Sequence, residues 1–270
     1  MLSDSPSTGA DAGAGAEGPV STEPEGAVGL SIYPVTGVGE INPGDDLAAL
    51  LAAALTPGAS ARPPVPGGLQ DGDVLVVTQK VVSKAEGRLV ELDATDPDAK
   101  RRLVEQESVR ILRRRGELLI SETPHGFICA NAGVDLSNVA TGTAALLPLD
   151  SDRSARGIRE ALEHRYGVSV GVVVSDTFGR PWRQGVTDVA IGIAGVAGVV
   201  DLRGTADAYG RILDVTEVCV ADELAGAAEL VMGKDRGVPA AVVRGVDPSW
   251  LRPASVAAEI VRPPAEDLFR

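Results

Sequence analysis

Two valine-rich runs constrain the fold of this chain more than any other feature. DVLVVT covers residues 73–78, and VSVGVVVS covers residues 168–175. Each contains an unbroken stretch of apolar residues that is too short for a typical helix and rich in β-branched side chains, a pattern typical of buried strands. The chain is therefore predicted to contain a substantially buried sheet.

Segments with helical patterns alternate with these strands, which predicts a mixed α/β fold. The expected helices cover residues 45–55 (with Asp45 or Asp46 as the N-cap), 98–115 (ended by Gly116), 155–166 and 217–232. The further expected strands cover residues 30–35, 118–121, 126–130 and 240–244. Residues 56–68 are expected to form a loop, because Pro and Gly recur there.

Composition separates an N-terminal tail from one folded domain. Residues 1–29 consist almost entirely of small, polar and acidic residues, which cannot bury enough apolar surface to fold. We therefore expect a disordered acidic tail over residues 1–29 and a single domain over residues 30–270.

Charge and hydropathy exclude several functional classes. The chain has 38 acidic and 25 basic residues and a net charge of −13, so nucleic acid is not an expected partner. No apolar run reaches the ~18 residues of a membrane helix, and the first residues do not resemble a secretory signal. We expect a cytoplasmic protein, with Cys129 and Cys219 as buried thiols in a reducing compartment.

Several common catalytic motifs are absent from the sequence. It contains no P-loop, no complete G-x-G-x-x-G, no G-x-S-x-G elbow and no H-E-x-x-H, and its two histidines are His125 and His164. An active site would therefore consist of carboxylates, lysines, arginines and backbone groups.

A cationic segment follows the first buried strand. Lys80, Lys84 and Arg88 are spaced by four residues, which would place them on one face of a helix. Such a face could bind an anionic ligand such as a nucleotide phosphate. The alternative interpretation is an ordinary solvated helix surface.

Two aspartates follow short or buried strands. Asp135 lies in the turn CANAGVDLSN and could bind a hard cation such as Mg²⁺, although an Asx-turn or a helix cap is the commoner role. Asp176 and Thr177 end the second valine-rich run, where ligand sites of α/β sheets tend to lie. Arg180 and Arg183 follow, and they suit an acidic substrate; the alternative is that they pair with local acids such as Asp188.

These segments together resemble the coenzyme F420 γ-glutamyl ligase family. GDVLVVTQKVVSKAEGRLV, AGVDLSNV, VSDTFGRPWRQGVTDVAIG and RPPAEDLF occur in this order within residues 30–270. The resemblance implies a two-lobed α/β fold, neither Rossmann nor P-loop, in an intertwined homodimer.

The resemblance also implies a reaction. GTP would phosphorylate a carboxylate of the deazaflavin precursor F420-0, and the amine of L-glutamate would then displace phosphate to form an amide. Later glutamates would be joined through γ-carboxylates. Mg²⁺ or Mn²⁺ at two sites would be required, and K⁺ would stimulate the reaction.

Site residues follow from the resemblance position by position. Asp135 and Asp176 would bind the first divalent ion and Thr177 the second, and Lys84 would act on a phosphate as a catalytic residue. As a separate hypothesis from their charge, Arg180 and Arg183 are expected to be catalytic residues that hold substrate carboxylates. GTP would contact Val38, Gly39, Glu40, Ile41, Gln79, Lys84, Asn138, Met232, Gly233, Lys234, Asp235, Arg236, Gly237, Val238 and Pro239.

Some points stay open in the sequence. Many family members place Gln or Glu on the second ion where this chain has Lys234, and Gly233 would equally suit an ordinary helix C-cap. Asp188 and Glu217 are candidates for the base that deprotonates the amine. A related amide ligase for another carboxylate, or a silent GTP- or metal-binding module, remains the alternative function.

Overall fold

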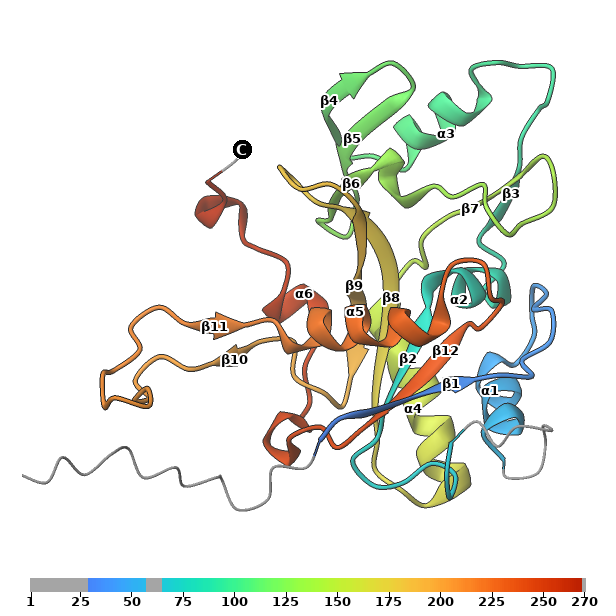
Figure 1. Ribbon diagram of the computed structural model, residues 1–270. Coiled ribbons are helices and arrows are strands. Elements are labelled where there is room, and N and C mark those ends of the chain that lie inside the picture. The colour runs from blue at the N-terminus through green and yellow to red at the C-terminus, as the bar shows by residue number, and fades with distance from the viewer. Residues whose placement is uncertain (1–28, 57–64, 269–270) are drawn as a thin grey trace, which may run out of the picture.

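A mixed sheet lies at the centre of the computed structural model, which describes residues 29–56 and 65–268 (Figure 1). The strand order in the described residues is β1 (Ser31–Val35), β12 (Ala240–Arg244), β2 (Val74–Thr78), β8 (Gly171–Gly179) and β9 (Val186–Ala194). β2 and β8 pair parallel, and the other neighbours pair antiparallel. The prediction of a mixed α/β fold is confirmed.

Helices cover both faces of this sheet (Figure 1). α1 (Leu47–Leu55) and α4 (Ser151–Tyr166) lie on one face, and α5 (Val220–Met232) lies on the other. Val172 and Val174 point into the first core and Val173 into the second, because successive residues of a strand face opposite sides. Coverage on both sides explains why the predicted buried strands lack polar side chains.

The residues that lie between β2 and β8 in the sequence form a separate, smaller core. It is built by α3 (Ala99–Gln106), a three-stranded sheet and a two-stranded ladder, and its apolar side chains include Leu103, Val104 and Leu119. The strands are β3 (Leu89–Glu91), β4 (Arg110–Arg115), β5 (Leu118–Glu122), β6 (Ile128–Ala130) and β7 (Thr143–Ala145).

The expected helix over residues 98–115 is wrong. α3 ends at Gln106, and β4 then pairs antiparallel with β5. Gly116 forms the connecting turn at φ +57°. Arginine favours helices, but the pairing of Arg114 with the buried Leu119 outweighs this weak local preference.

The remaining expected elements agree with the structure apart from their ends. Asp46 is the N-cap of α1, whereas α4 begins earlier than expected, after an N-cap at Asp150. α5 begins at Val220 because the two preceding residues form β11 (Glu217–Val218), which pairs with β10 (Val200–Asp201). β9 was not predicted from the sequence. The remaining short elements are α2 (Gln79–Ala85) and α6 (Val256–Glu259), together with single 3₁₀ turns at Asn131–Gly133, Pro248–Trp250 and Pro264–Glu266.

Other expectations have mixed outcomes. Cys129 is buried, but Cys219 is partly exposed, so burial of both thiols is wrong. The expected disordered tail lies outside the described residues except for residue 29, as does most of the expected loop at 56–68.

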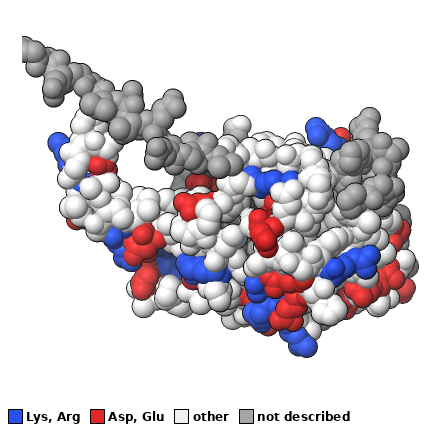
Figure 2. Space-filling view, turned by 90° about the horizontal axis from the view of Figure 1, so that it is seen from below, with Lys and Arg blue, Asp and Glu red and all other residues white. Residues whose placement is uncertain are grey.

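None of the helices in the described part of the chain is long and apolar enough to cross a membrane. Acidic and basic side chains are intermixed on the face shown in Figure 2.

One buried carboxylate joins three parts of the fold. Asp152, in the first turn of α4, accepts hydrogen bonds from Ile193 N in β9 (2.8 Å), Val256 N in α6 (2.9 Å) and Ala257 N (3.3 Å). The helix approaches β9 so closely that a Cβ on Gly192 would lie 2.3 Å from Ser151 O. α4, β9 and the C-terminal segment are therefore held together by backbone contacts and one charge.

Replacing this carboxylate should destabilise the whole domain. Asp152→Ala leaves buried N–H groups without an acceptor, and we expect the free energy of unfolding to fall by about 3 kcal/mol. Urea denaturation measures this change. Glu160→Ala, on the exposed face of the same helix, is the control and should shift the value by less than about 0.5 kcal/mol; equal effects would contradict the role of Asp152.

Candidate active site

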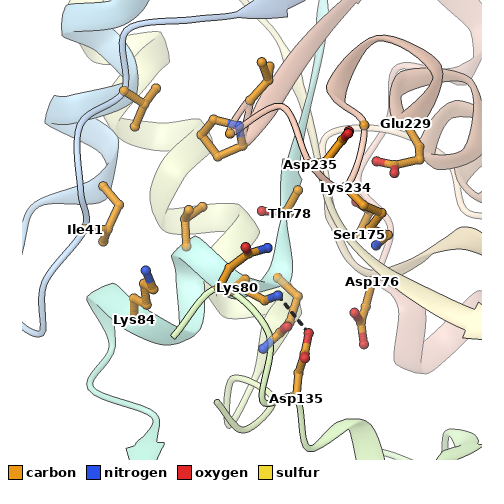
Figure 3. Close-up of a pocket in the computed structure, with 18 of the residues that line it drawn as sticks. Ile41, Thr78, Lys80, Lys84, Asp135, Ser175, Asp176, Glu229, Lys234 and Asp235 are labelled. Atoms are coloured by element: carbon orange, nitrogen blue, oxygen red, sulfur yellow. Dashed lines mark ion pairs between the residues drawn. The ribbon is translucent and has the colours of Figure 1, made fainter. Parts of the chain in front are cut away.

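A cavity of about 530 Å³ opens where β2 ends beside the middle of β8 (Figure 3). Thr78 and Ser175 are opposite each other at this edge of the sheet, and both line the cavity. The other walls come from residues 38–41, from α2, from the turn around Asp135, and from the end of α5 with the loop that follows it. Segments far apart in the sequence therefore meet at one site.

Two lysines of α2 form one wall of the cavity. Lys80 Nζ lies 2.8 Å from Asp135 Oδ2, and Lys84 Nζ lies 2.5 Å from Glu40 Oε1. Arg88 does not join them, because the helix ends at Ala85 and the Arg88 guanidinium donates to Leu147 O and pairs with Glu107. The predicted cationic face thus consists of two lysines rather than three cations.

The Gln79 side chain faces the protein interior, although the residue lines the cavity. Its amide donates to Leu146 O (3.0 Å) and to Ser83 Oγ (2.5 Å). These bonds fix the start of α2 against the chain that follows β7. The side-chain nitrogen of Gln79 is therefore used in hydrogen bonds within the protein.

Asp135 combines an Asx-turn with an ion pair. Its Oδ1 accepts a hydrogen bond from Ser137 N (2.7 Å), as the structural alternative predicted, while Oδ2 faces Lys80. Burial opposes the charge of Asp135, but the donors on Lys80 and Ser137 hold its pKa below the usual range. Nearby Asn138 also lines the cavity and adopts φ +53°.

Asp176 lies across the cavity from Asp135 (Figure 3). Its Oδ1 accepts a hydrogen bond from Thr177 N (2.8 Å). Removal from water raises the pKa of Asp176 to about 7, against the opposing effects of this hydrogen bond and of Lys234. The carboxylate is therefore poorly neutralised by the protein itself.

Asp135 and Asp176 both line the cavity and are the residues expected to bind a divalent cation. Among the described residues, no three His, Cys, Asp or Glu side chains gather into a metal-binding group. Mg²⁺ commonly binds through one or two carboxylates, completing its shell with phosphate oxygens and water. The incompletely neutralised Asp176 suits such a role.

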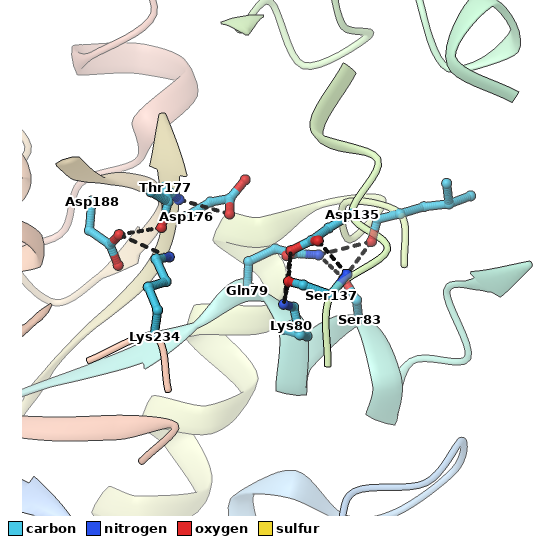
Figure 4. Close-up of polar contacts among 10 residues, drawn as sticks. Gln79, Lys80, Ser83, Asp135, Ser137, Asp176, Thr177, Asp188 and Lys234 are labelled. Carbon is cyan, nitrogen blue, oxygen red and sulfur yellow. Dashed lines mark hydrogen bonds and ion pairs between the residues drawn. The ribbon is translucent and has the colours of Figure 1, made fainter. Parts of the chain in front are cut away.

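Asp188 forms a second polar cluster beside Asp176 (Figure 4). It is 3% exposed and accepts hydrogen bonds from Ser175 Oγ (3.2 Å) and Thr177 Oγ1 (2.5 Å). Lys234 Nζ lies 3.4 Å from its Oδ1. Asp188 thus pairs with two hydroxyls and a lysine, rather than with Arg180 or Arg183.

The loop after α5 closes the cavity on the same side. Gly233, Lys234, Asp235, Gly237, Val238 and Pro239 line it. Met232 is instead fully buried in the core at the end of α5, and Arg236 is exposed outside the cavity lining. Gly233 also ends the helix at φ +64°, so its predicted role as a C-cap is confirmed.

Arg180 and Arg183 lie in the exposed turn between β8 and β9 and do not line the cavity. Arg180 donates to Gln184 O (2.7 Å). Thr177, on β8, is likewise absent from the cavity lining, because its hydroxyl is directed to Asp188. The structure therefore places the two arginines away from the cavity, whereas Thr177 lies behind its wall in contact with Asp176 and Asp188.

Comparison with known proteins identifies the family of this chain. The model of the F420-0:gamma-glutamyl ligase family matches residues 37–245, which includes every segment that lines the cavity. The chain belongs to this family.

Similar proteins cover most of the chain. A coenzyme F420:L-glutamate ligase from Methanothermobacter thermautotrophicus is 42% identical over 258 residues, covering 90% of this chain and all of that protein. The protein of the same name from Methanopyrus kandleri is 45% identical over 259 residues, covering 89% of this chain and 98% of its own length. The one from Methanocaldococcus jannaschii is 37% identical over 217 residues, covering 75% and 86%.

Some residues of this γ-glutamyl ligase site escaped the sequence analysis. Glu229 lines the cavity from α5, one turn before Gly233, and it resembles any other polar residue of an amphipathic helix in the sequence. Ser175 looked like the end of a buried strand. The spacing of Ser175 and Glu229 in the sequence does not indicate a shared site, because tertiary packing brings them together.

Proposed function

We propose that this protein is a coenzyme F420:L-glutamate ligase, joining L-glutamate to F420-0 and further glutamates through γ-linkages. The observation that carries the proposal is the cavity itself, which is lined by the lysines of α2 together with Asp135 and Asp176. Such a site suits a reaction that brings several anions together. The names of the similar proteins support the same assignment.

GTP is the proposed phosphoryl donor. Lys84 is held by a carboxylate that is largely exposed, Glu40, so an incoming phosphate can replace this weak partner. Residues 38–41 and 233–239 would contact the remainder of the nucleotide, since both segments contribute to the cavity. The turns at Gly233 and Gly237, both at φ +64°, allow the backbone to approach a ligand closely.

The proposed reaction has two steps. A carboxylate oxygen of F420-0 attacks the γ-phosphorus of GTP, and GDP leaves with the electrons of the broken P–O bond. The deprotonated amine of L-glutamate then attacks the acyl carbon, an amide forms, and phosphate leaves. Both steps concentrate negative charge, which Lys80 and Lys84 would stabilise.

Asp135 and Asp176 would hold a Mg²⁺ or Mn²⁺ ion. When bound, such an ion would neutralise phosphate oxygens and so lower the barrier to attack by the substrate carboxylate on the γ-phosphorus. K⁺ is proposed as a stimulating ion without an assigned residue. Of the two candidate bases, Asp188 lines the cavity, whereas Glu217 lies on β11 and pairs with Arg203.

The smaller core, which is separate from the two cores that flank the main sheet, supports the two-lobed fold that the resemblance implies. The matched residues 37–245 support the proposal that the ligase domain occupies most of residues 30–270.

Glutamate addition tests the proposed reaction directly. The full chain is mixed with F420-0, L-glutamate, GTP and Mn²⁺, and the products are followed by mass spectrometry. We expect a series of glutamate-sized mass increments with matching GDP release. Asp176→Ala should slow the addition by about a hundredfold or more, because the first cation loses a ligand.

The controls separate the alternative functions. Asp150→Ala removes an exposed carboxylate outside the cavity and should retain the reaction. GTP turnover with another acid but not F420-0 would indicate a related amide ligase. GTP binding without turnover on any acid would indicate a silent module, and either result would overturn the proposed function.

Arg180 and Arg183 are proposed to hold carboxylates of the substrates from the β8–β9 turn. Both are exposed in an acidic protein, so their charge is accessible to an anion. Arg183→Ala should raise the KM for F420-0 or L-glutamate about tenfold, with a smaller effect on kcat. Arg156→Ala, on the exposed face of α4, is the control; unchanged KM values for both substrates would refute the proposal.

A homodimer is proposed, with the β10–β11 arm as a contact surface. This arm extends away from the main sheet (Figure 1) and exposes Tyr209, Ile212 and Val215. Exposed apolar side chains on a projecting segment favour burial against a second copy. Sedimentation equilibrium should give twice the chain mass of 27.7 kDa.

Introducing a charge into the arm should shift this mass toward the monomer. Ile212→Asp places a carboxylate in the proposed contact, whereas Leu149→Asp changes an equally exposed apolar residue outside the arm. A wild-type monomer, or a dimer that Ile212→Asp leaves intact, would contradict the proposed contact.

A further inference from the structure

The wall formed by β8, β9 and the end of α5 is rich in carboxylates. Asp176, Asp188 and Glu229 all line the cavity there. Lys234 lies close enough that its positive charge acts on both Asp176 and Glu229. Among the described residues that line the cavity, it is the cation on this wall, since Lys80 and Lys84 belong to α2.

The Lys234 ammonium lies against an oxygen that already has a partner (Figure 4). Asp188 Oδ1 is 3.4 Å from Lys234 Nζ and accepts a hydrogen bond from Thr177 Oγ1 at 2.5 Å. Asp188 Oδ2 accepts from Ser175 Oγ at 3.2 Å. Both carboxylate oxygens of Asp188 are thus occupied by protein donors, and one of the donors carries a full positive charge.

The donor set at this place does not fit a second divalent ion. Lysine has three donors and no free electron pair while protonated, so it cannot act as a ligand. A divalent ion on Asp188 or Thr177 would lie within a few ångströms of the ammonium, and like charges at that separation repel strongly in a partly buried site. Asp135 likewise has Ser137 and Lys80 as partners, but the proposed first site differs through Asp176, whose Oδ1 accepts from Thr177 N while its Oδ2 is available to a cation.

We propose that the Lys234 ammonium occupies the place of a second divalent ion, so that one divalent ion binds per chain together with the nucleotide. This inference rests on the proposed GTP-dependent function. Lys234 lies in the loop between Gly233 and Gly237, and the positive φ angles of these two glycines determine the course of the loop. It therefore supplies a single charge at the carboxylate wall at any concentration of metal in solution.

Lys234 accordingly acts as a positioning residue for the polar cluster around Asp188. Its ammonium neutralises the buried carboxylate that orients the Thr177 and Ser175 hydroxyls. Replacing it with glutamine removes the charge and offers an amide oxygen in the same loop. Such an oxygen is a suitable ligand for Mn²⁺ or Mg²⁺.

Counting bound Mn²⁺ tests this inference independently of turnover. The full chain is titrated with Mn²⁺ in the presence of a non-hydrolysable GTP analogue, and free Mn²⁺ is measured by electron paramagnetic resonance. Binding to the analogue alone is subtracted. We expect one Mn²⁺ per chain for the wild type and two for Lys234→Gln.

Lys100→Gln is the matched control, because it removes the same charge from α3, outside the cavity. It should retain one Mn²⁺ per chain. Thermal unfolding of each variant establishes that it is folded, and the exposed position of Lys234 favours this.

Distinct results identify which proposal fails. Two ions in the wild type, or one ion in folded Lys234→Gln, would overturn the role of Lys234 while leaving the ligase proposal intact. The absence of any Mn²⁺ bound with the nucleotide would overturn the proposed metal site at Asp135 and Asp176, and the role of Lys234 with it.

Discussion

β2 and β8 run parallel, and β2 ends at Thr78, opposite Ser175, while β8 continues to Gly179. α2 begins directly after β2, which brings Lys80 and Lys84 to this end of β2, while the extension of β8 contributes Asp176. Cations and carboxylates separated by about ninety residues therefore meet through backbone pairing alone. The rest of the cavity is built around the end of β2.

Charge is distributed unequally around the cavity. On the α2 side each lysine has one carboxylate partner, whereas the opposite wall gathers Asp176, Asp188 and Glu229 around Lys234. Burial makes uncompensated charge costly on that wall, which is why the pKa values of Asp176 and Glu229 lie above their usual range. The cation proposed at Asp135 and Asp176 would relieve part of this cost.

The sequence predicted the fold where the pattern of side chains follows directly from burial. β2 and β8 were predicted because both their faces are covered. Asp135 and Asp176 were singled out from their positions after expected strands, and both line the cavity, although β8 in fact continues through Asp176 to Gly179. The prediction failed over residues 98–115, where long charged side chains suit either a helix or an edge strand. Local sequence contains no information on which partner strand is available.

Side-chain direction was equally inaccessible from the sequence. Gln79 and Thr177 were expected to face ligands, yet their side chains bond to Leu146 and Asp188. Both outcomes depend on residues far along the chain or on a neighbouring strand. Motif spacing places a residue near a site, but the competing hydrogen-bond partners decide where its polar atoms point.

The three-way contact of Asp152 has a consequence for the order of assembly. Its partners in α6 lie 104 and 105 residues further along the chain, whereas its partner in β9 is 41 residues away. During synthesis the carboxylate can bind β9 well before the last segment has emerged. The C-terminal segment then docks on a surface that already presents the Asp152 carboxylate as its hydrogen-bond acceptor. Closure of the domain is therefore a late step, which follows completion of the chain.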